Sequence, residues 1–226
     1  LEDVLQVAIF HPLFQFADTE PDDLSNYSNR APFAILHLQR EASIERAVAI
    51  ANTKLYVNRA DGFIGSGLKK DEFVADVSDL DDVIAFTKGG IMKVVRVSDK
   101  TFIGKDIIHV AVFQKNDERT TYNMIYADGK TGISFAKRFN VTGITRDKEY
   151  DLTKGSEKSK VHYFTANANG EAEVVKVVLS PNCSARIKEF DFYFEELDIK
   201  GRGSIGNQVT KYPIKAVKFK EAGVST

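Results

Sequence analysis

Tryptophan is absent from this chain of 226 residues, and cysteine occurs once, at Cys183. A single cysteine excludes a framework of disulfides and fits a reducing compartment. The most apolar stretch, residues 4–16, is too short to span a bilayer, contains Pro12 and has no basic flank. We therefore expect a soluble intracellular protein. Because the chain begins at Leu1 and not at Met, we also expect a piece of a longer protein.

Catalytic and metal signatures are missing as well. His11, His37, His109 and His162 are scattered without the spacing of metal ligands, and no cysteine pair accompanies them. Cys183 has no His or Asp neighbour in the sequence that would make it a nucleophile. The tyrosines fall in strand patterns or near turns, which favours packing. We predict no catalytic residue and no metal site.

One acidic run stays open as an alternative. Asp76, Asp79, Asp81 and Asp82 have the composition of a divalent cation site. The run lacks the glycine and the distal glutamate of a calcium loop, so a solvated connection between strands is the favoured interpretation. A hydrolase or a lectin-like propeller would use this cluster.

Charge is distributed unevenly along the chain, although the net charge is only -1. Residues 1–43 hold seven acidic and two basic side chains, and the rest of the chain carries a net charge of +4. An excess of this kind indicates a polyanionic partner for the second part and a separate role for the first. A solvated surface with a chance excess explains the same numbers.

A recurring hairpin dominates residues 50–220. Strands rich in Tyr, Phe, Val and Ile flank turns centred on glycine, with the turn glycines 28 to 41 residues apart, at Gly62, Gly90, Gly129, Gly170 and Gly203. The predicted hairpins cover residues 54–68, 83–97, 122–139, 161–179 and 197–219. Asp-Gly, Gly-Gly and Asn-Gly pairs tolerate the positive φ of tight turns. A period of this length is typical of propellers and arrays.

Each hairpin has an apolar face that it cannot bury alone, as the alternation of Val83 and Ala85 illustrates. Packing one repeat against the next buries these faces. The sequence therefore predicts an all-β fold of about five propeller-like blades.

The beginning of the chain differs from the repeats. Residues 17–32 contain Pro21, Pro32 and several Ser and Asn, which indicates a loop. Residues 33–49 place apolar side chains near helical spacing, so we predict a helix there. Residues 1–43 are interpreted as an acidic linker or variable extension, and residues 44–226 as the blade domain.

A second element recurs after the outgoing strands: a basic residue, an aromatic residue and a glycine. It occurs at residues 100–105, at residues 137–143 and, in a sparer form, at residues 200–207. A lysine or arginine beside glycine lets the backbone approach a phosphate while the side chain neutralises the phosphate charge. We expect the copies to lie along one basic rim.

Longer runs carry a resemblance to a known family. They cover residues 54–59, 62–65, 68–73, 100–109, 138–151 and 206–214. From about Ile44 to the end, the sequence resembles the C-terminal domain of the A subunit of bacterial type IIA topoisomerases, topoisomerase IV and gyrase. The resemblance implies a β-pinwheel, a propeller-like ring of four-stranded blades whose basic outer edge binds and bends duplex DNA. The gyrase-type box Gln-Arg-Arg-Gly-Gly-Lys-Gly is absent, with residues 200–206 as a degenerate counterpart, which favours the topoisomerase IV interpretation of decatenation and relaxation.

The resemblance also implies that this domain has no cofactor of its own. ATP and Mg²⁺ are used by other domains of the complex, so the expected partners are duplex DNA, the catalytic core and the ATPase subunit, in the bacterial cytoplasm and not at a membrane. The residues predicted to contact phosphates are Lys69, Lys70, Lys100, Lys105, Lys137, Arg138, Arg146, Lys200, Arg202, Lys211 and Lys215. The alternative is a protein-interaction propeller in which these residues form an ordinary polar rim.

Overall fold

The computed structural model describes residues 5–10, 35–40 and 53–222. It divides into two compact units, residues 1–50 and residues 51–226. The first unit contains a two-stranded antiparallel sheet of β1 (Leu5–Phe10) and β2 (Ile35–Arg40). The second unit contains four sheets and two short 3-10 helices, η2 (Ala168–Gly170) and η3 (Phe194–Glu196).

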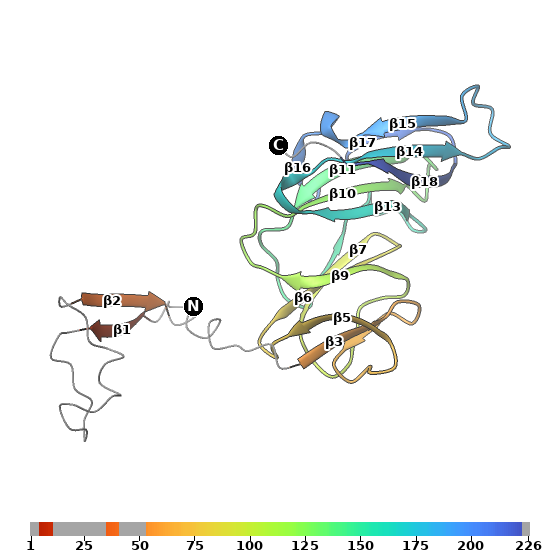
Figure 1. The fold of residues 1–226 in the computed structure, drawn as a ribbon. Coiled ribbons are helices and arrows are strands. Elements are labelled where there is room, and N and C mark those ends of the chain that lie inside the picture. Colours follow the sequence, from red (N-terminus) through yellow and green to blue (C-terminus); the bar gives the residue numbers. More distant parts are fainter. Residues whose placement is uncertain (1–4, 11–34, 41–52, 223–226) are drawn as a thin grey trace, which may run out of the picture. The chain divides into compact units, whose positions relative to one another are not determined.

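The four sheets of the second unit stack one after another (Figure 1). In spatial order, the first sheet contains β5 (Glu72–Val77), β3 (Thr53–Asn58), β4 (Phe63–Gly65) and β8 (Thr101–Phe102). The second contains β12 (Glu149–Asp151), β7 (Ile91–Arg96), β6 (Asp82–Thr87) and β9 (Ile107–Phe113). The third contains β13 (Lys160–Asn167), β10 (Thr121–Ala127), β11 (Ser134–Asn140) and β16 (Ile199–Gly201), with β17 (Asn207–Thr210) also paired to β11. The fourth contains β15 (Glu189–Tyr193), β14 (Val174–Leu179) and β18 (Ile214–Glu221).

Neighbouring sheets exchange strands. β8 follows the β6–β7 hairpin along the chain but pairs with β4 of the first sheet, and β12 follows the β10–β11 hairpin but pairs with β7 of the second. In the same way β16 and β17 follow β15 and pair with β11 of the third sheet. After each excursion the chain returns and pairs with the first strand of its own hairpin, β9 with β6, β13 with β10 and β18 with β14.

The core lies between the sheets. Successive residues of a strand point to opposite faces of its sheet, and both faces of the second sheet are covered. In β6, Val83 and Ala85 therefore pack against the first sheet, whereas Ile84 and Phe86 pack against the third. A further buried cluster around Val175 and Phe194 joins the third sheet to the fourth. The apolar faces of the repeats bury one another, as the alternation predicts.

The all-β prediction is confirmed, and these sheets are the blades of the predicted β-pinwheel. Residues 53–222 form four blades, however, and not five. The first three predicted hairpins pair as β3–β4, β6–β7 and β10–β11. The fourth and fifth predictions are wrong, because β13 and β14 belong to different sheets, as do β17 and β18. Strand exchange separates strands that are close in sequence, and the glycine spacing gave no sign of it.

The helix predicted for residues 33–49 is also wrong where it can be compared. β2 covers residues 35–40 and pairs with all six residues of β1. Hydrogen bonds to β1 hold residues 35–40 in a strand, although the spacing of their apolar residues is near-helical. Helix propensity is a weak preference, and pairing with another strand overrides it. The rest of the predicted helix and the predicted loop at residues 17–32 lie outside the described residues.

Candidate nucleic-acid interface

The hairpin turns of the first three sheets lie on one side of the second unit. We call this side the turn face and define it by residues 59–62, 69–71, 88–90, 103–106, 128–132 and 152–160. Backbone hydrogen bonds tie each turn to the next sheet: Ile107 N donates to Arg59 O at 2.9 Å, and Val161 N donates to Lys88 O at 2.8 Å. At the turn of the third sheet, Gly129 N donates to the side-chain Oγ of Ser159 at 3.1 Å. The β14–β15 loop, residues 180–188, and the β17–β18 turn with the start of β18, residues 211–215, extend this face to the fourth sheet (Figure 1).

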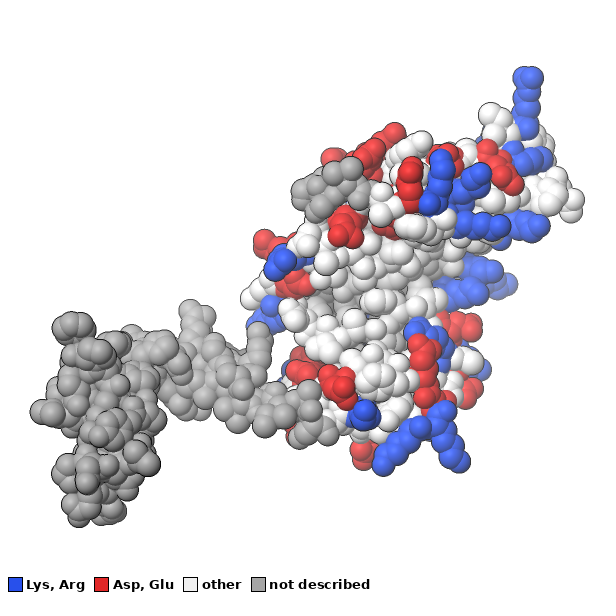
Figure 2. All heavy atoms as spheres, viewed as in Figure 1, with Lys and Arg blue, Asp and Glu red and all other residues white. Residues whose placement is uncertain are grey.

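Exposed basic side chains gather on the turn face. In Figure 2 they lie on the side toward which the β14–β15 loop projects. The exposed members are Lys69, Lys70, Lys88, Lys105, Lys130, Lys154, Lys158, Lys160, Arg186, Lys211 and Lys215. Among the described residues none of these eleven takes part in an ion pair. The turn face therefore presents basic side chains that are not held in ion pairs and that outnumber the exposed acidic side chains there, Asp61, Asp106 and Glu157. An excess of positive charge is the electrostatic requirement for binding a polyanion.

The opposite side, which we call the connection face, joins one sheet to the next. It comprises residues 78–81, 98–100, 114–120, 142–148, 168–173 and 194–202. Acidic side chains are frequent here, among them Asp79, Glu118, Glu171, Glu195 and Glu196, all exposed. The two faces of the second unit thus differ in charge.

The predicted phosphate contacts do not line one rim. The turn face carries Lys69, Lys70, Lys105, Lys211 and Lys215, and the connection face carries Lys100, Arg146, Lys200 and Arg202. The reason is strand exchange: β8 crosses from one face to the other, so Lys100 before it and Lys105 after it lie on opposite sides. The expectation that equivalent copies align is therefore corrected.

The predicted residues on the connection face make contacts within the protein. Arg146 Nε lies 2.9 Å from Asp82 Oδ1. The ammonium of Lys100 lies 4.2 Å from the ring centroid of Phe63. Because these groups already have partners, they are weaker candidates for phosphate contact than the turn-face lysines.

Arg202 and Lys200 also make contacts within the protein. The guanidinium of Arg202 lies 4.3 Å from the ring centroid of Tyr150, and its Nη1 donates to Gly143 O at 2.5 Å. Lys200 Nζ lies 3.9 Å from Asp198 Oδ2. The degenerate counterpart of the gyrase box is thus used to hold the third sheet to its neighbour.

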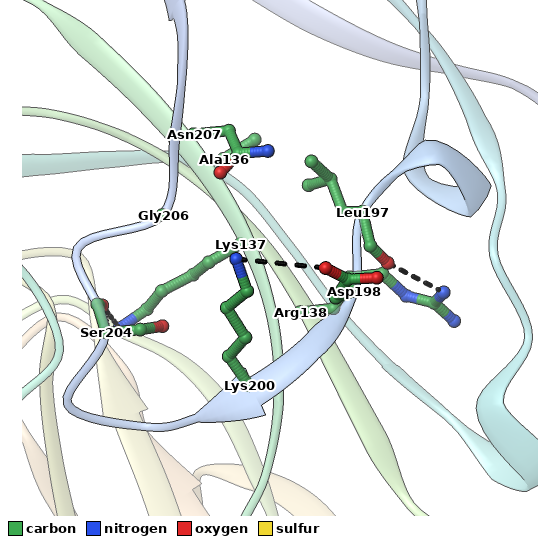
Figure 3. A pocket seen from close by; sticks show the side chains of 9 residues that line it. All are labelled: Ala136, Lys137, Arg138, Leu197, Asp198, Lys200, Ser204, Gly206 and Asn207. Carbon is green, nitrogen blue, oxygen red and sulfur yellow. Dashed lines mark hydrogen bonds and ion pairs between the residues drawn. The ribbon is translucent and has the colours of Figure 1, made fainter.

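Lys137 and Arg138 are buried, with 2% and 3% of their surface exposed. Lys137 Nζ donates to the backbone oxygens of Arg202 at 2.7 Å and of Ser204 at 3.0 Å. Burial lowers the pKa of Lys137 to about 8. Figure 3 shows this side chain reaching Ser204, which lies in the segment between β16 and β17. The cavity there measures about 10 Å³, room for one water molecule at most.

Arg138 joins the third sheet to the fourth. It donates to Gly170 O at 2.5 Å, to Leu197 O at 3.4 Å and to Asn123 Oδ1 at 3.2 Å. Asn123 Nδ2 in turn donates to the buried carboxylate of Glu173 at 2.7 Å. A side chain held in this way cannot reach a phosphate, so both buried residues are removed from the predicted set.

Five turn-face lysines were not predicted: Lys88, Lys130, Lys154, Lys158 and Lys160. A sequence signal was present, because Lys88 precedes Gly89, Lys130 follows Gly129 and Lys154 precedes Gly155. Three of the five lysines thus adjoin a glycine of the turn face, whereas Lys158 and Lys160 have no glycine beside them.

The acidic run at residues 76–82 forms a turn and ion pairs. Asp81 Oδ2 accepts from Ser78 N at 2.8 Å, and Asp82 pairs with Arg146. Asp76 lies 3.7 Å from Lys54 Nζ. Within residues 53–222 no three His, Cys, Asp or Glu side chains are grouped to hold a metal ion.

A cavity of about 140 Å³ lies between the second and third sheets, lined by His109, Phe113, Asp117 and Tyr122 among others. His109 Nε2 is buried and has no hydrogen-bond partner. Burial lowers the pKa of this imidazole, and the positive charge of Arg59 lowers it further. The ring lies 5.8 Å from that of Phe86 and 5.6 Å from that of Phe164. The geometry is that of a neutral histidine packed in an aromatic cluster.

Comparison with known families identifies the repeat unit. The family model described as topoisomerase C-terminal domain, Bacteroidota, matches residues 54–221, and the chain belongs to this family. A second model, described as a protein of unknown function (DUF1415), matches residues 1–60. The resemblance stated from the sequence is confirmed.

Two known proteins are similar to this chain. The A subunit of DNA topoisomerase 4 from Borreliella burgdorferi is 28% identical over 180 residues, which cover 77% of this chain and 26% of that protein. The chain thus spans about a quarter of the length of this relative. A solved structure of the DNA gyrase A C-terminal domain is similar at 13% identity and a TM-score of 0.40, covering 98% of this chain and 83% of that one. Among the described residues, no helix has the length and apolar character to cross a membrane.

Proposed function

We propose that this chain is the DNA-binding C-terminal region of a type IIA topoisomerase A subunit, and that it contacts duplex DNA through the turn face. One observation carries the proposal: eleven exposed basic side chains on this face, none in an ion pair among the described residues. The family membership of residues 54–221 supports it.

The mechanism is electrostatic and independent of sequence. Lysines that neutralise phosphates release counterions from the duplex, and this release drives binding. A lysine presents a flexible point charge, which suits contact with phosphates and not the reading of base edges. DNA that bends over several turns gains contacts, which offset a bending cost of about 1–6 kcal/mol.

In the whole enzyme, this region would direct strand passage that occurs elsewhere. The catalytic core and the ATPase subunit, with ATP and Mg²⁺, would perform cleavage and passage in the bacterial cytoplasm, and this region would select the DNA. The name of the Borreliella relative and the missing gyrase box favour decatenation and relaxation over supercoiling.

Salt-dependent binding of the chain to a linear duplex tests the turn face. The test variant is Lys69→Ala/Lys105→Ala/Lys211→Ala, and the matched control is Lys100→Ala/Lys115→Ala/Lys200→Ala on the connection face. Both remove three positive charges from exposed positions. We expect the turn-face variant to bind more weakly and the slope of log K against log salt to become shallower by up to about 3.

The control variant should retain most of the wild-type affinity and slope. Equal losses in the two variants would show that net charge alone governs binding, and the turn-face assignment would then fail. If the wild-type chain does not bind the duplex at low salt, the DNA-binding function itself is rejected.

A further inference from the structure

The hairpin edges of three sheets are covered in the same way. The second strand of each hairpin pairs with an antiparallel strand from a later part of the chain: β4 with β8, β7 with β12 and β11 with β17. The equivalent strand of the fourth sheet is β15. Within residues 53–222 it pairs with β14 alone, and its outer edge has no partner. An uncovered edge presents backbone N–H and C=O groups that pair with an extended chain.

The surroundings of this edge combine apolar and acidic groups. Ile187, just before β15, exposes 68% of its surface, and Tyr193, at the end of β15, exposes 38%. Glu195 and Glu196 follow on η3, and both are exposed. Complementary chemistry in an incoming strand is therefore apolar or aromatic in the centre and basic at the flanks.

A second copy of β15 is a poor occupant. Antiparallel self-pairing centred on Asp191 would place this residue directly opposite Asp191 of the second copy. Like charges in directly opposed positions destabilise a pair of strands. Lys220 Nζ lies 2.7 Å from Asp191 Oδ2 and compensates part of this charge, so the self-complementary arrangement is disfavoured only by the part of the repulsion that remains.

The exchanged strand of the first sheet shows what such an edge accepts. β8 and its flanks have the sequence Lys-Thr-Phe-Ile-Gly-Lys, residues 100–105, with an aromatic and an aliphatic residue between two lysines. Phe102 pairs with Phe63 across the two strands, and their ring centroids are 5.2 Å apart. An equivalent antiparallel strand on β15 would place its aromatic side chain beside exposed apolar surface. One of its lysines would lie beside Glu195 and Glu196, and the other at the opposite end of β15, near the exposed Glu189.

We propose that the outer edge of β15 binds an extended segment of another protein, in which aromatic or aliphatic residues are flanked by Lys or Arg, and which adds antiparallel as the fourth strand of this sheet. The interaction uses the edge of β15 and the carboxylates of Glu195 and Glu196 and none of the turn-face lysines, although Arg186 of the turn face directly precedes Ile187. The added strand would give the fourth sheet four strands, as in the first and second sheets.

Amide resonances of the ¹⁵N-labelled full chain, titrated with a peptide, test the proposal. The probe is the acetylated and amidated hexapeptide Lys-Thr-Phe-Ile-Gly-Lys, because the β4 edge that this sequence pairs with is already covered by β8. In the free chain, alternate amides of residues 189–193 should exchange rapidly with solvent. On addition of the peptide we expect saturable shifts and slower exchange at these residues.

Charge variants provide the controls. Glu195→Lys/Glu196→Lys should weaken peptide binding about tenfold, since the attraction of these two carboxylates for one end of the peptide becomes a repulsion. Glu118→Lys/Glu157→Lys changes the net charge equally at exposed positions away from this edge and should bind like the wild type. The peptide Glu-Thr-Phe-Ile-Gly-Glu should not bind.

Three results would overturn the proposal. Protection of residues 189–193 in the free chain would mean that another part of this chain already covers the edge. Shifts that saturate at other residues and not at 189–193 would place the peptide elsewhere. Equal binding by the two double variants would show that the acidic groups beside β15 do not recognise the strand.

Discussion

The carbonyl oxygen of Gly104 occupies the space where a side chain on Gly62 would begin. A Cβ atom on Gly62 would lie 2.2 Å from that oxygen, and Gly62 has a φ of +83°. The same exchanged segment fastens the turn, because Ile103 N donates to Gly62 O at 2.8 Å. Glycine is thus required here both by the left-handed backbone and by the close approach of another segment.

Gly62→Ala should therefore be strongly destabilising. We expect a loss of more than about 2 kcal/mol in the free energy of unfolding, because the positive φ costs about 1–2 kcal/mol and the backbone contact adds to it. Urea unfolding of the chain measures the change.

Two other glycines serve as controls for this prediction. Gly132 has a φ of +71°, but a Cβ atom added there would meet no other atom within 4 Å, so Gly132→Ala should lose only about 1 kcal/mol. Gly143 has neither feature, and Gly143→Ala should be within about 0.5 kcal/mol of the wild type. A Gly62 variant no less stable than the Gly132 variant would show that the exchanged segment moves aside easily.

Arg138 should affect stability and not DNA contact. Arg138→Lys keeps the charge but loses the planar fork that reaches Gly170 O, Leu197 O and Asn123 at once. Breaking a buried charged network costs about 3–5 kcal/mol, and we expect a loss toward the lower end because the charge remains. Urea unfolding measures the stability, and duplex binding of the folded fraction should keep its salt slope.

The exposed Arg146 is the matched comparison for Arg138. It pairs with Asp82 at the surface, so Arg146→Lys should change stability by less than about 1 kcal/mol. If Arg138→Lys is equally mild, the buried network is not what joins the third sheet to the fourth.

The sequence predicted strands well and sheets only in part. Alternation along β6 and the Gly62 and Gly90 turns correctly indicated hairpins that pack against neighbouring repeats, but one buried face was predicted and β6 buries both. Strand exchange was not predictable, because β8 is only two residues long and its partner β4 lies about 38 positions earlier in the chain. Pairing over such a distance leaves no periodic signal within a local window.

The candidate site was predictable by composition but not by position. Lys105 and Lys211 were predicted and lie exposed on the turn face, whereas Lys137 and Arg138 had the same local pattern and are buried. In β11 these two side chains point to opposite faces of one sheet, and each meets backbone carbonyls from an exchanged or neighbouring segment. When both faces of a strand are packed against other segments, its basic side chains bind backbone carbonyls within the protein. Only the order of the strands in the sheets shows which strands are packed on both faces.

Lys137 should make stability depend on alkaline pH. Its pKa in the folded chain is about 8, below the ordinary value of 10.5, so the folded state binds this proton less tightly than the unfolded state. The contribution to stability is fully present above about pH 10.5 and is lost as the pH falls through about 8. We expect the free energy of unfolding to rise by at most about 3 kcal/mol across this range through Lys137.

Lys137→Met separates this effect from other titrating groups. Other lysines and the tyrosines ionise over the same range, so the quantity to compare is the difference in unfolding free energy between wild type and variant at pH 7.5, 9 and 10.5. A difference that stays constant would mean that the buried ammonium is not destabilised relative to the unfolded chain.

His109 should make stability depend on acidic pH in the same sense. Burial lowers its pKa in the folded chain below the ordinary value of 6.5, so protonation favours the unfolded state. Its contribution to stability is present above about pH 6.5 and is lost as the pH falls through the lower folded pKa. His109→Phe keeps a ring in contact with Phe86, Tyr122 and Phe164 but removes the titrating group.

Urea unfolding of the wild type and the His109→Phe variant measures this dependence. We expect the wild type to lose more stability than the variant between pH 7 and pH 5. The pKa of His162 is also lowered by burial, but both proteins retain it, so the difference between them reports His109. If the free energy of unfolding depends on pH in the same way in both proteins, His109 is protonated in the folded chain without loss of stability. That result would contradict the assignment of a neutral imidazole packed among aromatic rings.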